Sequence, residues 1–393
     1  MAAPIVTLPA EAAAFVAGGG RDVDTAKLTE VAGLAAGAVV PLVDPRGDEL
    51  GVALHDPDNQ RLRVMVTPAD GFPTVSGAVL GWRVERALAW RKQLGLPGED
   101  ATYRVLNGAG DGVPGFTCDV LGRYAVLYAY APALVPWARQ LAEAVRGFVG
   151  VRGVVIKVRA RGGASDVTQE IVGETPPERY WAAEHGVGVE IHPLGGLNVG
   201  LFTDMREERQ RLGRFVGGGA VANLFSYTAM LSLTCARAGA ASVVSVDTSD
   251  GVAAWARGNF ARAGFAPDDP RWRFETGDAV RYLARAAKAK ERYRLIVIDP
   301  PTFSTARGAP WTLDRDYPAL IGQAAAVLEP GGVLWLAANT HELGSLTRLV
   351  GKGLKAAGKD GVIVAQGGLP ADYPTVAPQP RDRYLQIVVV RVA

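Results

Sequence analysis

The apolar and polar positions in the middle of the chain predict an alternation of strands and helices. An apolar run from Val221 to Phe225 has the length of a buried strand, and Ala229 to Ala238 has the apolar spacing of a helix. A second apolar run, Ser242 to Val246, ends on Asp247, and another helix-like stretch follows it. The predicted order is strand, loop, helix, strand, acid and helix, which is a βαβ unit.

The loop of this unit indicates the kind of ligand it would hold. A loop that leads into a helix offers free backbone N–H groups, and an acid about 20 residues later suits the two hydroxyls of a ribose. A dinucleotide enzyme would need G-x-G-x-x-G there, but residues 225–229 read Phe-Ser-Tyr-Thr-Ala. An adenosine cofactor without phosphates fits better, and S-adenosylmethionine (SAM) is the common one. A structural βαβ unit with an incidental Asp247 remains the alternative, and a nicotinamide-dependent oxidoreductase is disfavoured.

Further acids follow other predicted strands. The apolar run from Arg294 to Ile298 is followed by Asp299, and Asp278 comes shortly after a candidate strand, Trp272 to Glu275. In an open α/β sheet, ligands bind outside the carboxyl ends of the strands. We therefore expect one edge of the sheet to carry Asn223, Asp247, Asp278 and Asp299.

Several of these segments resemble the SAM-dependent methyltransferases of bacterial 23S ribosomal RNA. The similar segments are NLFSYT from Asn223, SVDTS from Ser245, the aspartate Asp278, DPPTFS from Asp299, GLFTDMR from Gly200, and the closing segments that start at Asp372 and Arg383. The family has a cytosine-C5 branch with an N-terminal PUA domain and a guanine-N7 branch. The resemblance extends over residues 37–393.

The resemblance implies an α/β fold with a C-terminal Rossmann-like class I methyltransferase domain. A small PUA-like β module and a central small α/β domain would precede it. The expected organisation is a flexible lead-in at 1–30, the β module at 31–76, a linker helix and central domain at 77–186, and the SAM-dependent domain at 187–393.

The resemblance also implies the roles of individual residues. The methionine end of the cofactor would be held by Asn223, Phe225, Ser226, Tyr227 and Thr228. Asp247, followed by Thr248, would bind the ribose and Asp278 the adenine, while Asp204 and Arg206 would close the pocket. The residues expected to face the cofactor and the target base are Asp299, Pro300, Pro301, Phe303 and Asn339.

The position of the cysteines bears on which base is methylated. Carbon-5 of cytosine needs covalent activation by a thiolate, and the cytosine branch has that cysteine after the fifth strand. This chain has Ala338-Asn339-Thr340-His341 there, and its two cysteines, Cys118 and Cys235, lie elsewhere. Asn339-Thr340 resembles a segment of the guanine-N7 branch, and guanine N7 has a lone pair that needs no activation. Guanine is therefore favoured over cytosine.

Other functions stay open on the sequence alone. Ala109 and Ala229 replace a glutamate and a glycine that are usual in the family. A catalytically weakened RNA-binding or ribosome-assembly factor is therefore one alternative. A methyltransferase for a small molecule or a protein is another, although the long N-terminal half argues against it.

Composition limits the remaining classes. An apolar content of 48% and a charged content of 21% are ordinary for a soluble protein, and no apolar run approaches the roughly 18 residues of a membrane span. The N-terminus lacks the basic start of a signal peptide, so we expect a cytoplasmic protein. The two cysteines and four histidines show no metal spacing, so we expect no metal.

Charge is distributed unevenly along the chain. Residues 1–75 have a net charge of −5 and residues 196–393 one of +6. Contacts with RNA phosphates are therefore expected mainly from the C-terminal half. In the central domain, Lys157, Arg159 and Arg161 alternate along a predicted strand and so would form an RNA-facing stripe. A homodimer is a further expectation.

Overall fold

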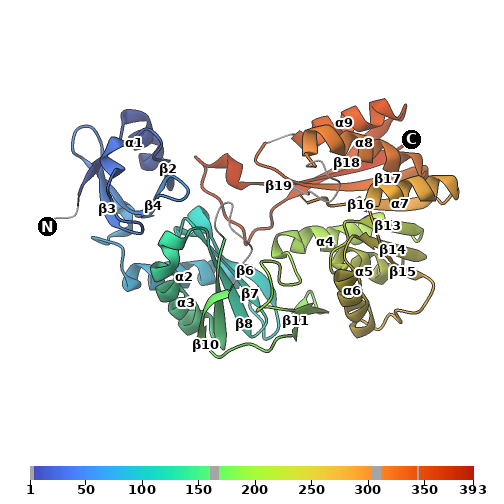
Figure 1. Ribbon diagram of the computed structural model, residues 1–393, viewed down its shortest axis with the longest axis horizontal. Helices are drawn as coiled ribbons and strands as arrows, with labels where there is room; N and C mark the ends of the chain where they lie inside the picture. The colour runs from blue at the N-terminus through green and yellow to red at the C-terminus, as the bar shows by residue number, and fades with distance from the viewer. Residues whose placement is uncertain (1–3, 160–167, 302–310, 343–344) are drawn as a thin grey trace. The chain divides into compact units, whose positions relative to one another are not determined.

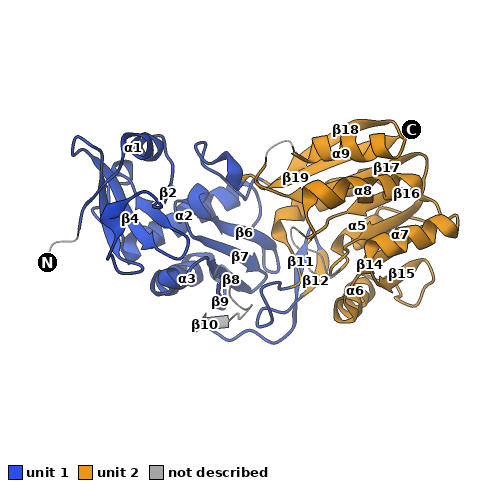
Figure 2. Cartoon of the chain, turned by 45° about the horizontal axis from the view of Figure 1, so that its top comes forward, with its two compact units in different colours: residues 1–186, 191–199, 371–382 blue, residues 187–190, 200–370, 383–393 orange. Residues whose placement is uncertain are grey.

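We describe the protein from a computed structural model that defines residues 4–159, 168–301, 311–342 and 345–393. The chain divides into two compact units (Figure 2). Unit 1 comprises residues 1–186, 191–199 and 371–382, and unit 2 comprises residues 187–190, 200–370 and 383–393. Two segments of the stretch expected to form a single domain, 191–199 and 371–382, therefore belong to unit 1.

The N-terminal part of unit 1 is a five-stranded sheet with helix α1 (Ala10–Ala17) (Figure 1). Its strands, in spatial order, are β1 (Val6–Thr7), β3 (Val39–Val43), β4 (Glu49–Asp56), β5 (Arg61–Val66) and β2 (Asp22–Asp24). Only β1 and β3 run parallel; the other neighbours are antiparallel. A small β module, which the resemblance implies, is therefore present.

Residues 4–30 do not form a flexible lead-in. Val6, Leu8, Val16 and Val23 are buried in the core of the β module. The glycine- and alanine-rich composition suggested a loose segment, but these apolar side chains recur at spacings that let one short helix and two short strands bury them.

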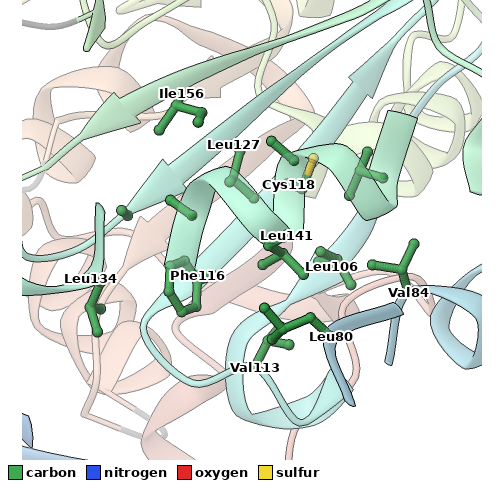
Figure 3. Packing of buried hydrophobic residues seen from close by; sticks show 14 of the residues in the cluster. Leu80, Val84, Leu106, Val113, Phe116, Cys118, Leu127, Leu134, Leu141 and Ile156 are labelled. Carbon is green, nitrogen blue, oxygen red and sulfur yellow. The ribbon is translucent and has the colours of Figure 1, made fainter. Parts of the chain in front are cut away.

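The second part of unit 1 is a sheet with two helices packed on it, α2 (Gly77–Gln93) and α3 (Val135–Val149). Its strands, in spatial order, are β10 (Thr168–Gly173), β9 (Gly153–Val158), β8 (Tyr124–Ala129), β7 (Phe116–Leu121) and β6 (Thr102–Asn107). Figure 3 shows the core between them, where Leu80 and Val84 of α2 and Leu141 of α3 lie near strand residues such as Phe116 and Leu127. α2 lies at the start of the range 77–186, where a linker helix was expected.

A buried arginine connects α2 to the returning segment 371–382. Arg91 is fully buried, and its guanidinium donates to both carboxylate oxygens of Asp111 at 2.6 and 2.8 Å and to the carbonyl oxygen of Asp372 at 2.7 Å. Asn107 donates to the carbonyl oxygen of Pro374. Arg91 is therefore buried and charge-paired, with partners that come from distant parts of the chain.

Unit 2 is built on a seven-stranded sheet with the spatial order β15-β14-β13-β16-β17-β19-β18. The bounds are β13 (Ala220–Leu224), β14 (Ser242–Asp247), β15 (Trp272–Thr276), β16 (Tyr293–Ile298), β17 (Leu328–Asn339), β18 (Gly361–Gly368) and β19 (Leu385–Val392). The first five in this order are parallel, and β19 and β18 are antiparallel to their neighbours. The expected Rossmann-like sheet is confirmed.

Helices cover both faces of this sheet. Ala222, Val244 and Ile296 point to a core shared with α7 (Ala279–Lys288), α8 (Leu313–Ala326) and α9 (Ser345–Ala356). Alternate residues point the other way. Asn223 donates to Ser232 of α5 (Met230–Arg237), and Phe274 packs edge-on against Phe260 of α6 (Asp250–Arg262). The sheet is therefore wound on both sides.

The remaining elements are short. They are β11 (Tyr180–Glu184), β12 (Val187–Ile191), α4 (Arg206–Leu212) and the 3₁₀ turns Thr29–Val31, Pro68–Asp70, Gly108–Asp111, Pro132–Leu134, Thr203–Met205, Gly213–Phe215 and Pro380–Asp382. β11 and β12 form a two-stranded sheet. Within the described ranges, no helix is long and apolar enough to cross a membrane.

The contact between Gly110 and the returning segment can be tested by substitution. A Cβ at Gly110 would lie 1.8 Å from the carbonyl oxygen of Pro374, so Gly110→Ala must displace segment 371–382. We expect a loss of about 1–3 kcal/mol in the free energy of unfolding, measured with urea. The control is Gly147→Ala in the interior of α3, where a Cβ meets no atom within 4 Å and should stabilise by up to about 1 kcal/mol. Equal unfolding midpoints for the two variants would contradict this packing.

Candidate functional site

The candidate site lies at the carboxyl edge of the parallel strands in unit 2. The chain runs outward from β13 to β14 and β15 and then returns to place β16 on the other side of β13. This reversal is a topological switch point, where open α/β sheets bind ligands. Leu224 and Ile298 pair as the last residues of β13 and β16. Phe225 and Asp299, which follow them, therefore flank the switch point.

The loop after β13 has an unusual backbone. Phe225, Tyr227 and Ala229 all have positive φ angles, of 61°, 47° and 61°. This left-handed conformation costs a residue with a side chain roughly 1–2 kcal/mol, and such strain concentrates at functional sites. The backbone N–H of Ser226 donates to the carbonyl oxygen of Val246, and the backbone N–H of Ala229 donates to the carbonyl oxygen of Ser226. Ala229 thus adopts the left-handed backbone conformation that a glycine would adopt. Its methyl group lowers the stability of the fold but leaves the backbone conformation of the loop unchanged.

Asp247 connects this loop to the end of β14. Its carboxylate accepts the backbone N–H of Tyr227 at 2.9 Å and that of Ser249 at 3.3 Å. A carboxylate has about four acceptor positions, so capacity remains for the hydroxyls of a ribose. The next residue, Thr248, is exposed. The geometry at Asp247 fits an adenosine cofactor.

The segment that starts at Gly200 is bound to the same loop. Gly200 donates its N–H to the hydroxyl of Tyr227 at 2.9 Å, and its carbonyl oxygen accepts the hydroxyl of Thr228 at 2.7 Å. A Cβ at Gly200 would lie 2.3 Å from the ring of Trp255. Thr228, expected to contact the cofactor, therefore has its side chain engaged in holding this segment. Ser226 is also buried.

Asn223 lies inside the protein rather than at the open edge. It is fully buried, and its amide donates to Ser232, whose hydroxyl oxygen also accepts from Ser245. The side chain therefore braces β13 and β14 against α5. Because side chains alternate along β13, this residue faces α5 even though it is close to the carboxyl edge.

Asp299 has the most perturbed carboxyl group of the site. Burial and the negative charge of Asp204 raise the pKa of Asp299 to about 7, against the opposing effect of Arg209. Asp204, in the 3₁₀ turn before α4, accepts the hydroxyl of Tyr384 at 3.0 Å. A ligand with a positive charge would lower the cost of ionising Asp299 beside Asp204. Pro300 is buried and Pro301 exposed, whereas Phe303 lies outside the described residues.

Two tyrosines that the sequence did not single out hold these groups. Tyr317 of α8 donates its hydroxyl to the carbonyl oxygens of Ile298 and Ala337, so it ties β16 to β17 below Asp299. Tyr384 contributes its carbonyl oxygen to the N–H of Thr340 as well as its hydroxyl to Asp204. An isolated tyrosine carries no spacing signal, so only the tertiary structure shows these roles.

The other predicted site residues differ in their exposure to solvent. Asn339 is the exposed last residue of β17, and Asp278 caps the N-terminus of α7 by accepting the N–H of Arg281 at 3.0 Å. Arg206 is buried, with a guanidinium nitrogen 3.3 Å from the carboxylate of Glu207.

The expected basic stripe in unit 1 needs a correction. Lys157 is fully buried, and its ammonium donates to the carbonyl oxygens of Gly195 and Gly196 at 3.0 and 2.6 Å. Burial lowers the pKa of Lys157 to about 8. Of the three residues expected to alternate along a strand, only Lys157 lies in β9, which ends at Val158. The segment 191–199 covers this lysine, so it cannot meet RNA directly. Arg159 is exposed, and Arg161 lies outside the described residues.

Comparisons with known proteins agree with this geometry. A family model described as S-adenosylmethionine-dependent methyltransferase matches residues 139–383. Two curated proteins named Ribosomal RNA large subunit methyltransferase I are each 27% identical. The one from Klebsiella pneumoniae (strain 342) aligns over 91% of this chain and 90% of its own, and the one from Cronobacter sakazakii over 90% of each.

Two solved structures share the fold. A SAM-dependent methyltransferase from Streptococcus mutans superimposes with a TM-score of 0.85 at 22% identity, covering 98% of this chain and 100% of its own. A methyltransferase crystallised with SAH has a TM-score of 0.88 at 22% identity, covering 98% and 99%.

The raised pKa of Asp299 predicts how stability depends on pH. The folded protein keeps this proton up to about pH 7, whereas an unfolded chain loses it near pH 3.8. Stability is therefore lost as the pH rises between these values. Asp299→Asn removes the ionisation and should raise the free energy of unfolding at pH 8, by at most about 4 kcal/mol at 1.36 kcal/mol per pKa unit.

This gain should shrink as the pH falls from 8 towards 4, which urea unfolding at several pH values would measure. A gain in the free energy of unfolding that does not depend on pH, or a loss of it at pH 8, would contradict the raised pKa of Asp299.

Proposed function

Because the chain belongs to the family of S-adenosylmethionine-dependent methyltransferases, we propose that it methylates a base of bacterial large-subunit (23S) ribosomal RNA. The observation that carries this proposal is the similarity to proteins named Ribosomal RNA large subunit methyltransferase I, which extends over 91% of this chain. The similarity therefore reaches well beyond the sheet that would bind the cofactor. A small substrate would not require unit 1.

The residues present fit SAM. The loop 225–229 and Asp247 would hold the methionine and ribose parts, and Asp278 the adenine. When bound, SAM supplies a methyl group on a positively charged sulfur. The carboxyl groups of Asp204 and Asp299 favour that charge, and the same interaction is absent with the neutral product SAH, which helps product release.

We favour N7 of a guanine as the acceptor atom. Its lone pair would form the new bond to the methyl carbon while the carbon–sulfur bond breaks towards sulfur, and no proton has to leave. A cytosine-C5 reaction would need a thiolate. Cys118 and Cys235 are both buried, and burial raises the pKa of both thiols. The role left to Asn339 and Asp299 is to orient the base.

The proposal is tested with in-vitro-transcribed 23S rRNA and SAM, followed by digestion to nucleosides and mass spectrometry. The expected product is 7-methylguanosine. Asp247→Ala should raise the dissociation constant of SAM by at least about tenfold, because the ribose loses a charged hydrogen-bond partner. Asp269→Ala is the matched control, since this acid pairs only with Arg271 at 2.6 Å outside the candidate site and should not change SAM binding.

Each other outcome has a distinct meaning. The appearance of 5-methylcytidine would overturn guanine as the methylated base but would support 23S rRNA as the substrate. SAM binding without any methylated nucleoside would reject the proposed activity and leave an RNA-binding or assembly factor.

We also propose that the protein acts as a homodimer in the cytoplasm, where its RNA substrate is made. The feature that supports dimerisation is β18, an edge strand on which Val362, Ile363 and Val364 are 60%, 39% and 47% exposed. Exposed apolar edge strands pair with other chains, and a charge on the edge prevents it. Sedimentation velocity should give twice the chain mass of 41.3 kDa, reduced to the monomer by Ile363→Lys. A monomeric wild-type protein would refute this.

A further inference from the structure

An exposed phenylalanine stands at the candidate site. Phe202 is 44% exposed, and its ring lies 5.3 Å from that of Tyr227, centroid to centroid, at an interplanar angle of 46°. The ring of Tyr227 in turn packs edge-on against Trp255 at 6.0 Å. Phe202 is therefore the outer member of a row of three aromatic rings, with much of its surface open.

The backbone of this residue is fixed on both sides. Its carbonyl oxygen accepts a guanidinium N–H of Arg209 at 2.6 Å and the N–H of Met205 at 3.4 Å. Two residues earlier, Gly200 is held by the hydroxyls of Tyr227 and Thr228. The ring is thus presented by a constrained segment, and a preorganised contact loses little conformational entropy when a ligand binds.

The position of the ring relates it to the chemistry. Its neighbour Tyr227 donates its backbone N–H to Asp247, the acid expected to bind the ribose. Asp204 follows Phe202 by two residues and raises the pKa of Asp299 through its charge. Phe202 therefore belongs to the segment that connects the cofactor loop with the acid pair at the switch point.

We propose that Phe202 is the stacking platform for an unpaired, extruded base of the RNA acceptor. This inference rests on the proposed function. RNA-binding proteins read unpaired bases by stacking them on aromatic side chains, and enzymes that modify bases take them out of the stack. The negative charge of Asp204, which disfavours ionisation of Asp299, also repels phosphates, so the uncharged base is the part of RNA that suits this position.

The substitution Phe202→Ala tests the proposal without endangering the fold, because the ring is half exposed and its backbone bonds do not depend on it. Removal of a stacking ring should lower kcat/KM for in-vitro-transcribed 23S rRNA by about 5- to 100-fold, mainly through KM. The dissociation constant of SAM, measured by calorimetry, should stay within about twofold, which is less than 0.5 kcal/mol.

Matched variants separate stacking from simple burial. Phe202→Tyr keeps the aromatic face and should retain the wild-type kcat/KM, whereas Phe202→Leu keeps apolar area and should resemble Phe202→Ala. Phe148→Ala is the control for loss of an exposed phenylalanine, since Phe148 is 46% exposed on α3 of unit 1. Phe148→Ala should change neither kcat/KM for 23S rRNA nor the dissociation constant of SAM.

Three results would overturn the inference. An unchanged KM for RNA in Phe202→Ala would show that no base rests on the ring. A weakened affinity for SAM that accounts for the whole loss would place the ring on the cofactor instead. If the wild-type protein binds SAM but leaves 23S rRNA unmethylated, the proposed function fails first and the stacking inference fails with it.

Discussion

The hydrogen bond from the backbone of Tyr227 to the carboxylate of Asp247 is the interaction on which the site depends. It connects the loop after β13 to the end of β14 and so sets the distance between the two parts that would hold the cofactor. The loop is strained at three positions, and its strain is offset by contacts on both sides: Asp247 from the sheet and Gly200 from the preceding segment. Strain at this place is typical of a preorganised site.

A second constraint is electrostatic. Asp299 remains at the switch point although burial and Asp204 disfavour its charge. The pair lowers the stability of the folded protein once the pH rises towards 7, and we propose that it serves to bind a ligand. A cationic sulfonium at this place, as proposed above, would relieve the repulsion and so couple cofactor binding to deprotonation of Asp299. Hydrogen bonds fix the groups next to this pair: the hydroxyl of Tyr384 donates to Asp204, and that of Tyr317 donates to the carbonyl oxygen of Ile298.

Unit 1 is held together by charges of a different kind. Arg91 is fully buried with its carboxylate partner Asp111, and both lie under the segment 371–382. A buried guanidinium is stable only when its donors are satisfied, and here the acceptors come from sequence positions up to 281 residues away. These residues look like ordinary surface charges along the sequence. The same applies to Lys157, which is buried and donates to the carbonyl oxygens of Gly195 and Gly196.

Features that rest on local periodicity and spacing could be predicted from the amino-acid sequence. The apolar runs that form β13, β14 and β16 predicted the Rossmann-like sheet. Asp247 and Asp299 come at the ends of two of these runs, so both were expected at the carboxyl edge of the sheet. The glycine-free loop and the missing cysteine limited the chemistry. Contacts between distant segments required the tertiary structure: the burial of Lys157 and Arg91, the inward orientation of Asn223, the packing of residues 4–30, the hydrogen bonds of Tyr317 and Tyr384, and the exposure of Phe202 beside Tyr227. Periodicity shows which way a side chain points from its own element, but what covers it depends on elements far away in the chain.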